Sequence, residues 1–134
     1  MYIKNEMVIK MKEISVLIIE DSIYSADLNV RELKKAGFIV CHKMVSSRQL
    51  MQNALKEGKW DLIISDNSMP NFNALKSLEI RNCINKNIPF IIVSEDICQK
   101  DIDKAFEEGC TAYVTKENLT ELRKVAKNIL MTES

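Results

Sequence analysis

The chain has 134 residues, of which 46% are hydrophobic and 28% are charged. This mixture is typical of one globular domain with a core of its own, and it excludes a disordered, collagenous or disulfide-built chain. Nineteen Lys and Arg residues balance nineteen Asp and Glu residues, so the formal net charge is zero. We therefore expect no general electrostatic attraction to a membrane surface and no direct nucleic-acid binding.

The N-terminal residues do not resemble a targeting signal. Residues 1–13 carry scattered charges and lack the apolar stretch of a secretory signal. No later run approaches the roughly 20 apolar residues of a membrane span. We expect a cytoplasmic protein that does not enter a membrane, with an N-terminal extension at residues 1–13, one domain at residues 14–131 and a C-terminal tail at residues 132–134.

The cysteines carry no metal-binding pattern. None of the four forms a CxxC pair, and the single histidine, His42, lies directly beside one of them in an apolar stretch. This arrangement favours buried or half-buried thiols in a reducing compartment over a zinc site. The four cysteines are Cys41, Cys83, Cys98 and Cys110.

Five segments are predicted to be β-strands. In chain order they are residues 16–19, 39–45, 62–64, 90–93 and 112–115. The first, third and fourth are apolar without alternation, which is typical of strands buried on both faces in the middle of a parallel sheet. The second and fifth have weaker patterns and fit positions nearer the edges of the sheet.

Apolar residues recur at helical spacing between and after these strands. We expect helices before Gly37, Gly58 and Gly109, another at about residues 73–83, and a last one that closes the chain. Each glycine stands where a residue with left-handed backbone commonly ends a helix. We expect Phe106, in the fourth helix, to lie in the core. Strands that alternate with helices predict an α/β fold with a doubly wound, five-stranded parallel sheet and five flanking helices.

Polar side chains directly follow four of the strands. Glu20 and Asp21 follow the first, Asp66 the third, Ser94 the fourth and Lys116 the fifth. Because ligands of such sheets bind beyond the carboxyl ends of the strands, we expect these side chains to form one site.

Three carboxylates at one edge repel each other unless a cation is present, and oxygen ligands suit Mg²⁺ better than zinc. An aspartate in this position can act as a nucleophile toward phosphorus. The metal and Lys116 would then neutralise the charge on the transferring group, while Ser94 would donate a hydrogen bond to it. The pattern therefore predicts phosphoryl transfer to Asp66 with Mg²⁺ as cofactor.

Four segments resemble the receiver domains of bacterial response regulators and hybrid histidine kinases. They are residues 16–22, 61–70, 91–94 and 109–116, and the resemblance extends over residues 14–130. It implies a flavodoxin-like fold with strand order 2-1-3-4-5 in a two-component phosphorelay. It also implies a sensor histidine kinase or phosphotransfer protein as phosphoryl donor, and an output domain or a homodimer partner as receiver of the signal.

The resemblance assigns a role to each residue of the expected site. Asp66 would be the phosphoacceptor that becomes an aspartyl phosphate. Asp21 would be a direct Mg²⁺ ligand, Glu20 a ligand through water or a support for Asp21, and Ser68 a ligand through its backbone carbonyl.

The same resemblance implies a switch on the other side of the acceptor. Lys116 would pair with the phosphoryl group, and Ser94 would move toward that group on activation. Tyr113 occupies the place of the aromatic switch residue, whose ring turns inward when the hydroxyl moves.

Glu95 and Ala74 are among the positions that depart from the family pattern. Glu95 follows Ser94 where the family usually has a small residue, and its carboxylate could screen Asp66 from a donor. The second hypothesis is therefore a degenerate receiver that serves as a phosphorylation-independent interaction or dimerisation module. Ala74 stands where the family often has glycine, and a positive φ at this alanine would cost about 1 kcal/mol.

A third hypothesis is an enzyme or flavin carrier on the same fold, because fold alone does not fix function. The sequence contains no GxGxxG or GxxxxGK[ST] loop that could hold a nucleotide phosphate. Trp60 precedes a strand, so it is expected at the opposite end from the site, and Ser68 stands where an aspartyl phosphatase would have a second aspartate. We therefore expect no enzyme activity beyond the domain's own phosphorylation and dephosphorylation.

Overall fold

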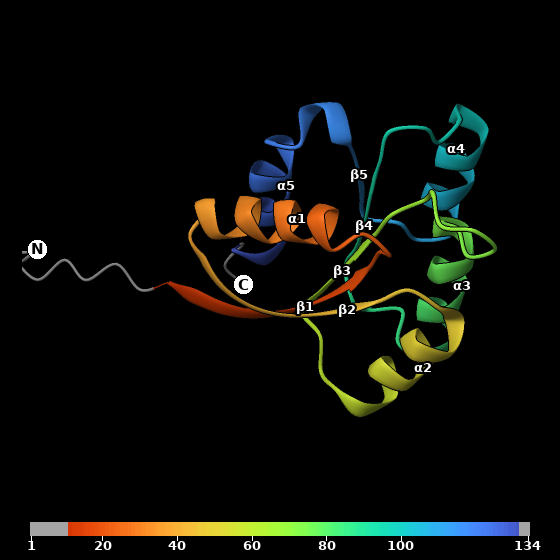
Figure 1. The fold of residues 1–134 in the computed structure, drawn as a ribbon, viewed down its shortest axis with the longest axis horizontal. Helices are drawn as coiled ribbons and strands as arrows, with labels where there is room; N and C mark the ends of the chain where they lie inside the picture. The colour runs from red at the N-terminus through yellow and green to blue at the C-terminus, as the bar shows by residue number, and fades with distance from the viewer. Residues whose placement is uncertain (1–10, 132–134) are drawn as a thin grey trace, which may run out of the picture.

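The computed structural model describes residues 11–131, which form a parallel sheet between two layers of helices (Figure 1). The strand order is β2-β1-β3-β4-β5, and every neighbouring pair is parallel, so the predicted doubly wound fold is confirmed. The elements in chain order are β1 (Lys12–Ile19), α1 (Ile23–Lys35), β2 (Phe38–Val45), α2 (Arg48–Glu57), β3 (Leu62–Ser65), α3 (Ala74–Ile84), β4 (Phe90–Ser94), α4 (Gln99–Glu107), β5 (Ala112–Thr115), a 3₁₀ turn (Lys116–Asn118) and α5 (Glu121–Leu130).

The first strand is longer than its apolar run, because β1 begins at Lys12. The predicted N-terminal extension therefore overlaps the sheet at residues 12 and 13. Residues 1–10 and the predicted tail at residues 132–134 lie outside the described residues. Within the described part of the chain, no helix is long and apolar enough to cross a membrane.

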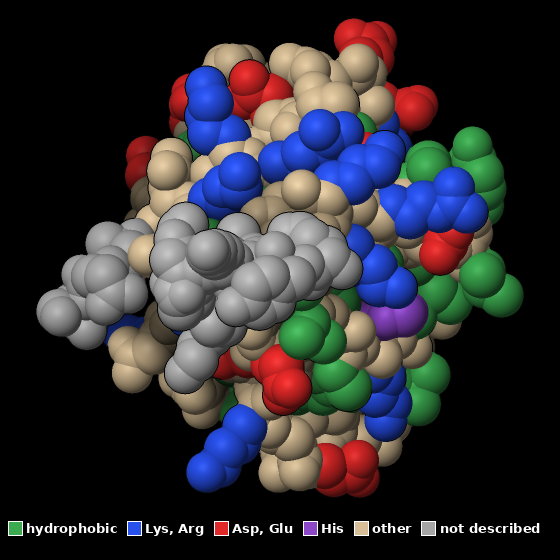
Figure 2. All heavy atoms as spheres, turned by 90° about the vertical axis from the view of Figure 1, so that its left-hand side faces the viewer, with side chains coloured by type: hydrophobic (Ala, Val, Ile, Leu, Met, Phe, Trp, Pro, Cys, Tyr) green, Lys and Arg blue, Asp and Glu red, His purple; other side chains and the backbone are tan. Residues whose placement is uncertain are grey.

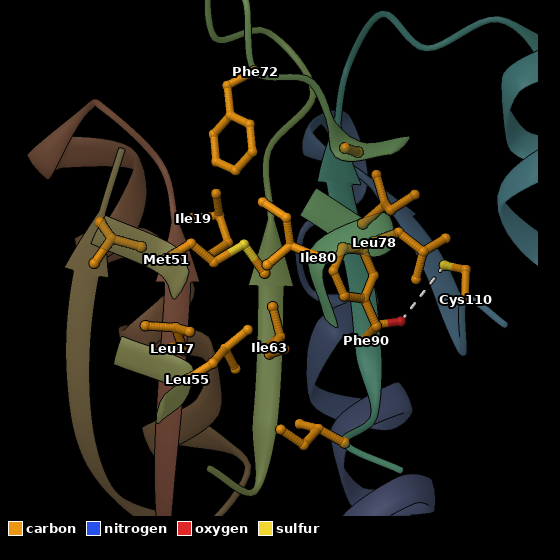
Figure 3. Packing of buried hydrophobic residues seen from close by; sticks show 14 of the residues in the cluster. Leu17, Ile19, Met51, Leu55, Ile63, Phe72, Leu78, Ile80, Phe90 and Cys110 are labelled. Carbon is orange, nitrogen blue, oxygen red and sulfur yellow. Dashed lines mark hydrogen bonds between the residues drawn. The ribbon is translucent and has the colours of Figure 1, made fainter. Parts of the chain in front are cut away.

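Two hydrophobic clusters lie on opposite faces of the sheet. Alternate residues of β1 belong to different clusters. Leu17 lies in the first cluster, on the face covered by α2, α3 and α4, whereas Val16 and Ile18 lie in the second, on the face covered by α1 and α5. Figure 3 shows the first cluster, in which Met51 of α2 and Phe90 of β4 are completely buried. Burial on both faces explains why the central strands have uninterrupted apolar sequences.

Polar side chains and glycines set the helix ends. The hydroxyls of Ser22 and Ser47 accept the backbone N–H three residues further on and so begin α1 and α2. Gly37 and Gly109 have φ values of 106° and 103°, as the helix-ending glycines were expected to have. Gly58 differs, since its backbone is extended, and the Trp60 indole lies only 3.2 Å from the position that a Cβ would take.

Several predictions of burial are wrong. Phe106 is 46% exposed, because α4 has only Ala105 fully buried. Cys110 is buried as expected, but the other three thiols are exposed. His42 is exposed as well, and Figure 2 shows its imidazole at the surface with hydrophobic side chains beside it. Ile23 and Met44 line a shallow hollow together with this histidine.

Candidate functional site at the carboxyl edge of the sheet

The strand register places the acidic residues side by side. Ile19 at the end of β1 pairs with Ser65 at the end of β3, so Glu20 and Asp66 leave the sheet from adjacent strands. The backbone N–H of Asp66 donates to the Ile19 carbonyl at 2.9 Å, which holds the two chain segments together beyond the last strand residues.

Glu20, Asp21 and Asp66 form the acidic cluster. They offer carboxylate oxygens that all lie within 4.8 Å of one another, an arrangement able to hold a metal ion. Glu20 and Asp66 are 2% and 4% exposed, whereas Asp21 is exposed at the mouth of the site. The buried Oδ1 of Asp66 has no hydrogen-bond partner within the described residues, although it forms an ion pair.

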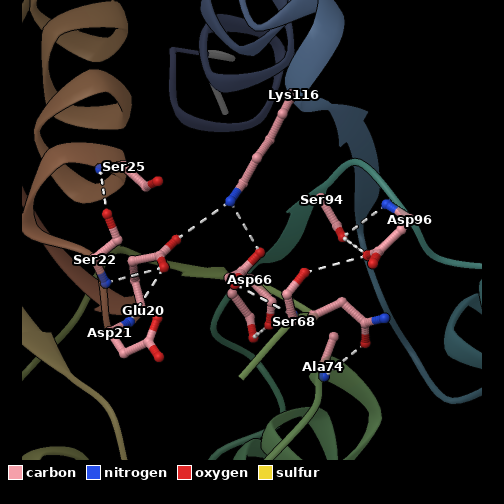
Figure 4. Close-up of polar contacts among 12 residues, drawn as sticks. Glu20, Asp21, Ser22, Ser25, Asp66, Ser68, Ala74, Ser94, Asp96 and Lys116 are labelled. Carbon is pink, nitrogen blue, oxygen red and sulfur yellow. Dashed lines mark hydrogen bonds and ion pairs between the residues drawn. The ribbon is translucent and has the colours of Figure 1, made fainter. Parts of the chain in front are cut away.

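Lys116 supplies the cation of that ion pair. It follows β5 as the first residue of the 3₁₀ turn, and Figure 4 shows its side chain reaching down between the two buried carboxylates. Its Nζ lies 3.2 Å from Asp66 Oδ1 and 3.7 Å from Glu20 Oε1. Burial acts to lower the pKa of Lys116, but the charges of Asp66 and Glu20 outweigh it, so the pKa is raised and the ammonium is retained.

The surroundings of Glu20 destabilise the charged form of its carboxylate. Burial, followed by the negative charge of Asp66, raises its pKa above the ordinary value of 4.5. The charge of Lys116 opposes that rise in pKa. The backbone N–H groups of Asp21 and Ser22 oppose it as well, since each donates to Glu20 Oε2 at 3.2 Å. The cluster therefore carries more negative charge than its single ammonium neutralises, which favours binding of a further cation.

The loop after β3 shapes one wall of the site. Ser68 donates its backbone N–H to Asp66 Oδ2 at 3.2 Å. Asn67 Oδ1 accepts the N–H of Ala74 at 3.0 Å, and Asn71 has a positive φ of 61°. Ala74 itself is buried in the first turn of α3, so the strain considered for this alanine does not arise.

Two buried hydroxyls form hydrogen bonds at the two ends of this loop. Ser65 and Ser77 are completely buried, and their Oγ atoms lie 2.8 Å apart. Ser65 Oγ lies 3.0 Å from the Asp66 carbonyl, and Ser77 Oγ lies 3.0 Å from the Ala74 carbonyl. Because each hydroxyl has one proton, one serine donates to the other, which donates to its carbonyl. The pair connects the end of β3 to the start of α3 and so fixes the backbone that carries Asp66.

Ser94 lies at the same edge, but its hydroxyl contacts Asp96. Ser94 Oγ donates to Asp96 Oδ1 at 3.3 Å, and the Asp96 N–H lies 3.4 Å from the same Oγ. Asp96 Oδ1 also accepts the Ser68 hydroxyl at 3.2 Å. The sequence prediction missed Asp96, because no periodicity marks a loop residue; its only signal is a carboxylate two positions beyond a strand-end hydroxyl.

Tyr113 is half-buried on β5 next to Ser94. Its hydroxyl donates to the Ser94 backbone carbonyl at 3.4 Å. Burial, followed by the charges of Glu117 and Asp96, raises the pKa of Tyr113, so the phenol remains a donor. Glu95, which follows Ser94, is exposed and forms no hydrogen bond or ion pair within residues 11–131, although its charge contributes to the raised pKa of Lys116.

The structure thus brings the predicted site residues to one sheet edge and adds Asp96 to them. Fold and site together define a doubly wound α/β domain with an acidic, lysine-paired site beyond β1, β3 and β5. Residues 16–127 match the sequence model of the response regulator receiver domain, and the chain belongs to this family.

Individual relatives agree with this assignment. The swarming motility regulation protein RssB of Serratia marcescens is 24% identical over 103 residues, which are 76% of this chain and 46% of that protein. The chain therefore spans about half the length of this relative. A LuxR-family DNA-binding response regulator from Staphylococcus aureus is 25% identical, with a TM-score of 0.73 over 87% of this chain and 98% of that structure.

A third relative carries a metal ion. It is the receiver domain of a sensor histidine kinase from Pseudomonas aeruginosa PAO1, solved with magnesium coordinated in its active site cleft. It is 16% identical, with a TM-score of 0.72 over 90% of this chain and 99% of that one. At this identity the likeness shows a shared fold.

Proposed function

We propose that this receiver domain accepts a phosphoryl group on Asp66 and changes its protein contacts in response. The observation that carries the proposal is the state of the Asp66 carboxylate. It is almost completely buried at the sheet edge, and within the described residues its Oδ1 has only the Lys116 ammonium, 3.2 Å away, as a partner. A nucleophile in this setting has free lone pairs and a cation in place for the incoming group.

In the reaction, an oxygen of the Asp66 carboxylate forms a bond to phosphorus while the bond between phosphorus and the donor breaks. With a phosphohistidine donor whose other ring nitrogen is protonated, the nitrogen bound to phosphorus leaves with the electron pair of that bond, and the ring departs as neutral imidazole. Lys116 stabilises the negative charge on the phosphoryl oxygens, and its raised pKa keeps it cationic during the transfer.

The residues present fit a divalent magnesium ion. Three carboxylate oxygens lie within 4.8 Å of one another, and within the described residues a single ammonium, that of Lys116, pairs with two of these carboxylates, Glu20 and Asp66. Glu20, Asp21, Asp66 and the backbone carbonyl of Ser68 would hold the ion, which when bound supplies the positive charge that the phosphoryl group requires. Magnesium in the cleft of the Pseudomonas receiver domain supports this choice of metal.

Ser94 and Tyr113 are the proposed switch residues. The Tyr113 hydroxyl already bonds the Ser94 carbonyl, so a movement of Ser94 toward the phosphoryl group changes the contacts of Tyr113 directly. Receiver domains interact with kinases and output domains. For this chain we propose a cytoplasmic location and a sensor histidine kinase or phosphotransfer protein as donor. An output domain or a second copy of the chain would be the partner that responds to the switch.

Beryllofluoride, a mimic of the acyl phosphate, tests the proposal. Added with Mg²⁺ and followed by thermal unfolding, it should raise the melting temperature of the wild type by linkage to the folded state. Asp66→Asn should abolish the increase. Asp61→Asn is the matched control, since Asp61 lies just before the same strand at its other end, where it accepts the Ser15 N–H at 2.8 Å. An unchanged melting temperature in the wild type would refute the proposal.

A degenerate receiver is the competing function, and Glu95 distinguishes the two. The Glu95 side chain is exposed and unpaired within the described residues, but its charge acts on Lys116. If the wild type does not accept phosphate from a small-molecule donor and Glu95→Gly does, the chain is an interaction module whose acceptor is screened. If both are phosphorylated at similar rates, Glu95 does not block the site.

A further inference from the structure

The hydroxyl of Ser94 forms hydrogen bonds with Asp96, a residue outside the acidic cluster. Both hydrogen bonds of its Oγ within residues 11–131 are with Asp96, one to the carboxylate at 3.3 Å and one from the backbone N–H at 3.4 Å. A serine hydroxyl has one proton. While that proton is donated to Asp96, it is not available to an oxygen of a phosphoryl group on Asp66.

Asp96 also bridges the two loops that border the acceptor. Its Oδ1 accepts the Ser68 hydroxyl at 3.2 Å, and the Ser68 N–H donates to Asp66 Oδ2 at 3.2 Å. Figure 4 shows Ser68 between Asp66 and Asp96, with the hydroxyls of Ser68 and Ser94 both directed at the Asp96 carboxylate. The loop after β3 and the loop after β4 are therefore joined through one carboxylate oxygen.

We propose that Asp96 is a positioning residue that holds the Ser94 hydroxyl away from Asp66 in the unmodified domain, and that Ser94 must leave Asp96 for the switch to operate. This inference rests on the proposed function, because the competing acceptor is a phosphoryl oxygen at Asp66. Asp96 is exposed, and its hydrogen bonds are 3.2 to 3.4 Å long. The hydrogen bond between Ser94 and Asp96 is therefore weak enough for a phosphoryl oxygen on the buried Asp66 to replace it.

The contact between Asp96 and Ser94 also affects Tyr113, the second proposed switch residue. Tyr113 donates to the carbonyl of the same Ser94 whose hydroxyl is bound by Asp96. The charge of Asp96 also contributes, after burial and Glu117, to the raised pKa of the Tyr113 phenol. Loss of the Asp96 carboxylate should therefore alter the surroundings of the Tyr113 ring even without phosphorylation, since a released Ser94 shifts the balance between two arrangements of this face.

Beryllofluoride affinity in the presence of Mg²⁺ is the first measurement. Asp96→Ala should bind about three- to tenfold more tightly than the wild type, the range that corresponds to one hydrogen bond of ordinary net strength. Asp96→Asn keeps an oxygen acceptor and should remain closer to the wild type. Glu95→Ala is the matched control, since it removes the same charge one residue away, from a side chain that forms no hydrogen bond with Ser94 within the described residues. Equal gains for Glu95→Ala and Asp96→Ala would show general repulsion and overturn the proposal, as would no gain for Asp96→Ala.

The second measurement does not require phosphoryl chemistry. NMR spectra of tyrosine-labelled, unmodified protein without Mg²⁺ should show shifted Tyr113 ring resonances in Asp96→Ala, with wild-type positions retained in Glu95→Ala and largely recovered in Asp96→Asn. Unshifted Tyr113 resonances in Asp96→Ala would refute the hold on Ser94. A wild type that fails to bind beryllofluoride would refute the proposed function instead, and the tyrosine spectra alone would then decide whether Asp96 positions Ser94.

Discussion

Replacement of Lys116 by methionine tests the electrostatic balance of the site most directly. Lys116 is the one cation that pairs with Glu20 and Asp66 within the described residues, at 3.7 and 3.2 Å. Methionine keeps an apolar stem of similar shape but removes the charge. Because the two carboxylates are almost completely buried, water cannot replace the ammonium, so we expect the metal-free variant to lose stability at pH 7.

The protonation of Glu20 limits the size of this loss. Burial and Asp66 raise the pKa of Glu20 above 4.5, and without Lys116, which opposes the rise, the pKa must increase further. A neutral Glu20 at pH 7 costs about 1.36 kcal/mol for each of the roughly 2.5 pH units above its ordinary value, a limit of about 3.4 kcal/mol for this group. The wild type already bears part of that cost, so we expect Lys116→Met to lower the free energy of unfolding by about 2 kcal/mol.

The pH dependence gives the sign of the effect. Because the pKa of Glu20 is raised by folding, the folded state binds the proton more tightly, and the associated stability is complete below pH 4.5 and is lost as the pH rises through the raised value. The pKa of Lys116 is raised above 10.5, so its ammonium stays charged between pH 4.5 and 7, and the pH dependence in this range comes from the ionisation of Glu20. The stability difference between variant and wild type should therefore be large at pH 7 and small at pH 4.5.

Urea unfolding followed by the fluorescence of Trp60, the single tryptophan, measures both effects. Mg²⁺ should restore a large part of the lost stability at pH 7, since it replaces the missing positive charge. Lys124→Met on the exposed face of α5 is the control and should change little. An equal loss at pH 4.5 and pH 7, or an equal loss in the control, would contradict this account of the site.

Two further predictions concern the scaffold, and urea midpoints test both. Met51→Ala empties a completely buried position under the sheet and should cost about 2–5 kcal/mol, whereas Leu50→Ala, on the half-exposed neighbour, should cost far less; similar losses would mean that the packing of α2 is misplaced. Gly37→Ala forces a residue with a Cβ into a φ of 106° and should cost about 1–2 kcal/mol, and an unchanged midpoint would show that the turn after α1 adjusts freely.

Much of the fold was predictable because strands buried on both faces consist almost entirely of apolar residues. β1, β3 and β4 are covered by helices on both faces, so their apolar residues run without interruption. α4 was harder, since a stripe of apolar residues does not say how deeply a peripheral helix is buried, and Phe106 is half outside. Exposed thiols were missed for a related reason: a cysteine on an edge strand or an outer helix face has the same sequence neighbours as a buried one.

For the site, the residues directly after each strand could be named in advance, because parallel strands end at one edge and carry the next residue with them. This holds for Glu20, Asp66 and Lys116, which directly follow β1, β3 and β5. Asp96 could not be named, since its carboxylate reaches Ser68 across two loops whose paths depend on the packing of α3 and α4.

The sequence by itself determined the order of strands and helices, the polarity of the sheet edge and the identity of the acidic residues, because these depend on local pattern and on the geometry common to parallel sheets. Only the tertiary structure decided which partner each side chain takes. The Ser94 hydroxyl forms a hydrogen bond with Asp96 and not with Asp66, and Lys116 forms ion pairs with two buried carboxylates. Sequence alone does not give these partners, because the atoms meet only after distant parts of the chain have packed together.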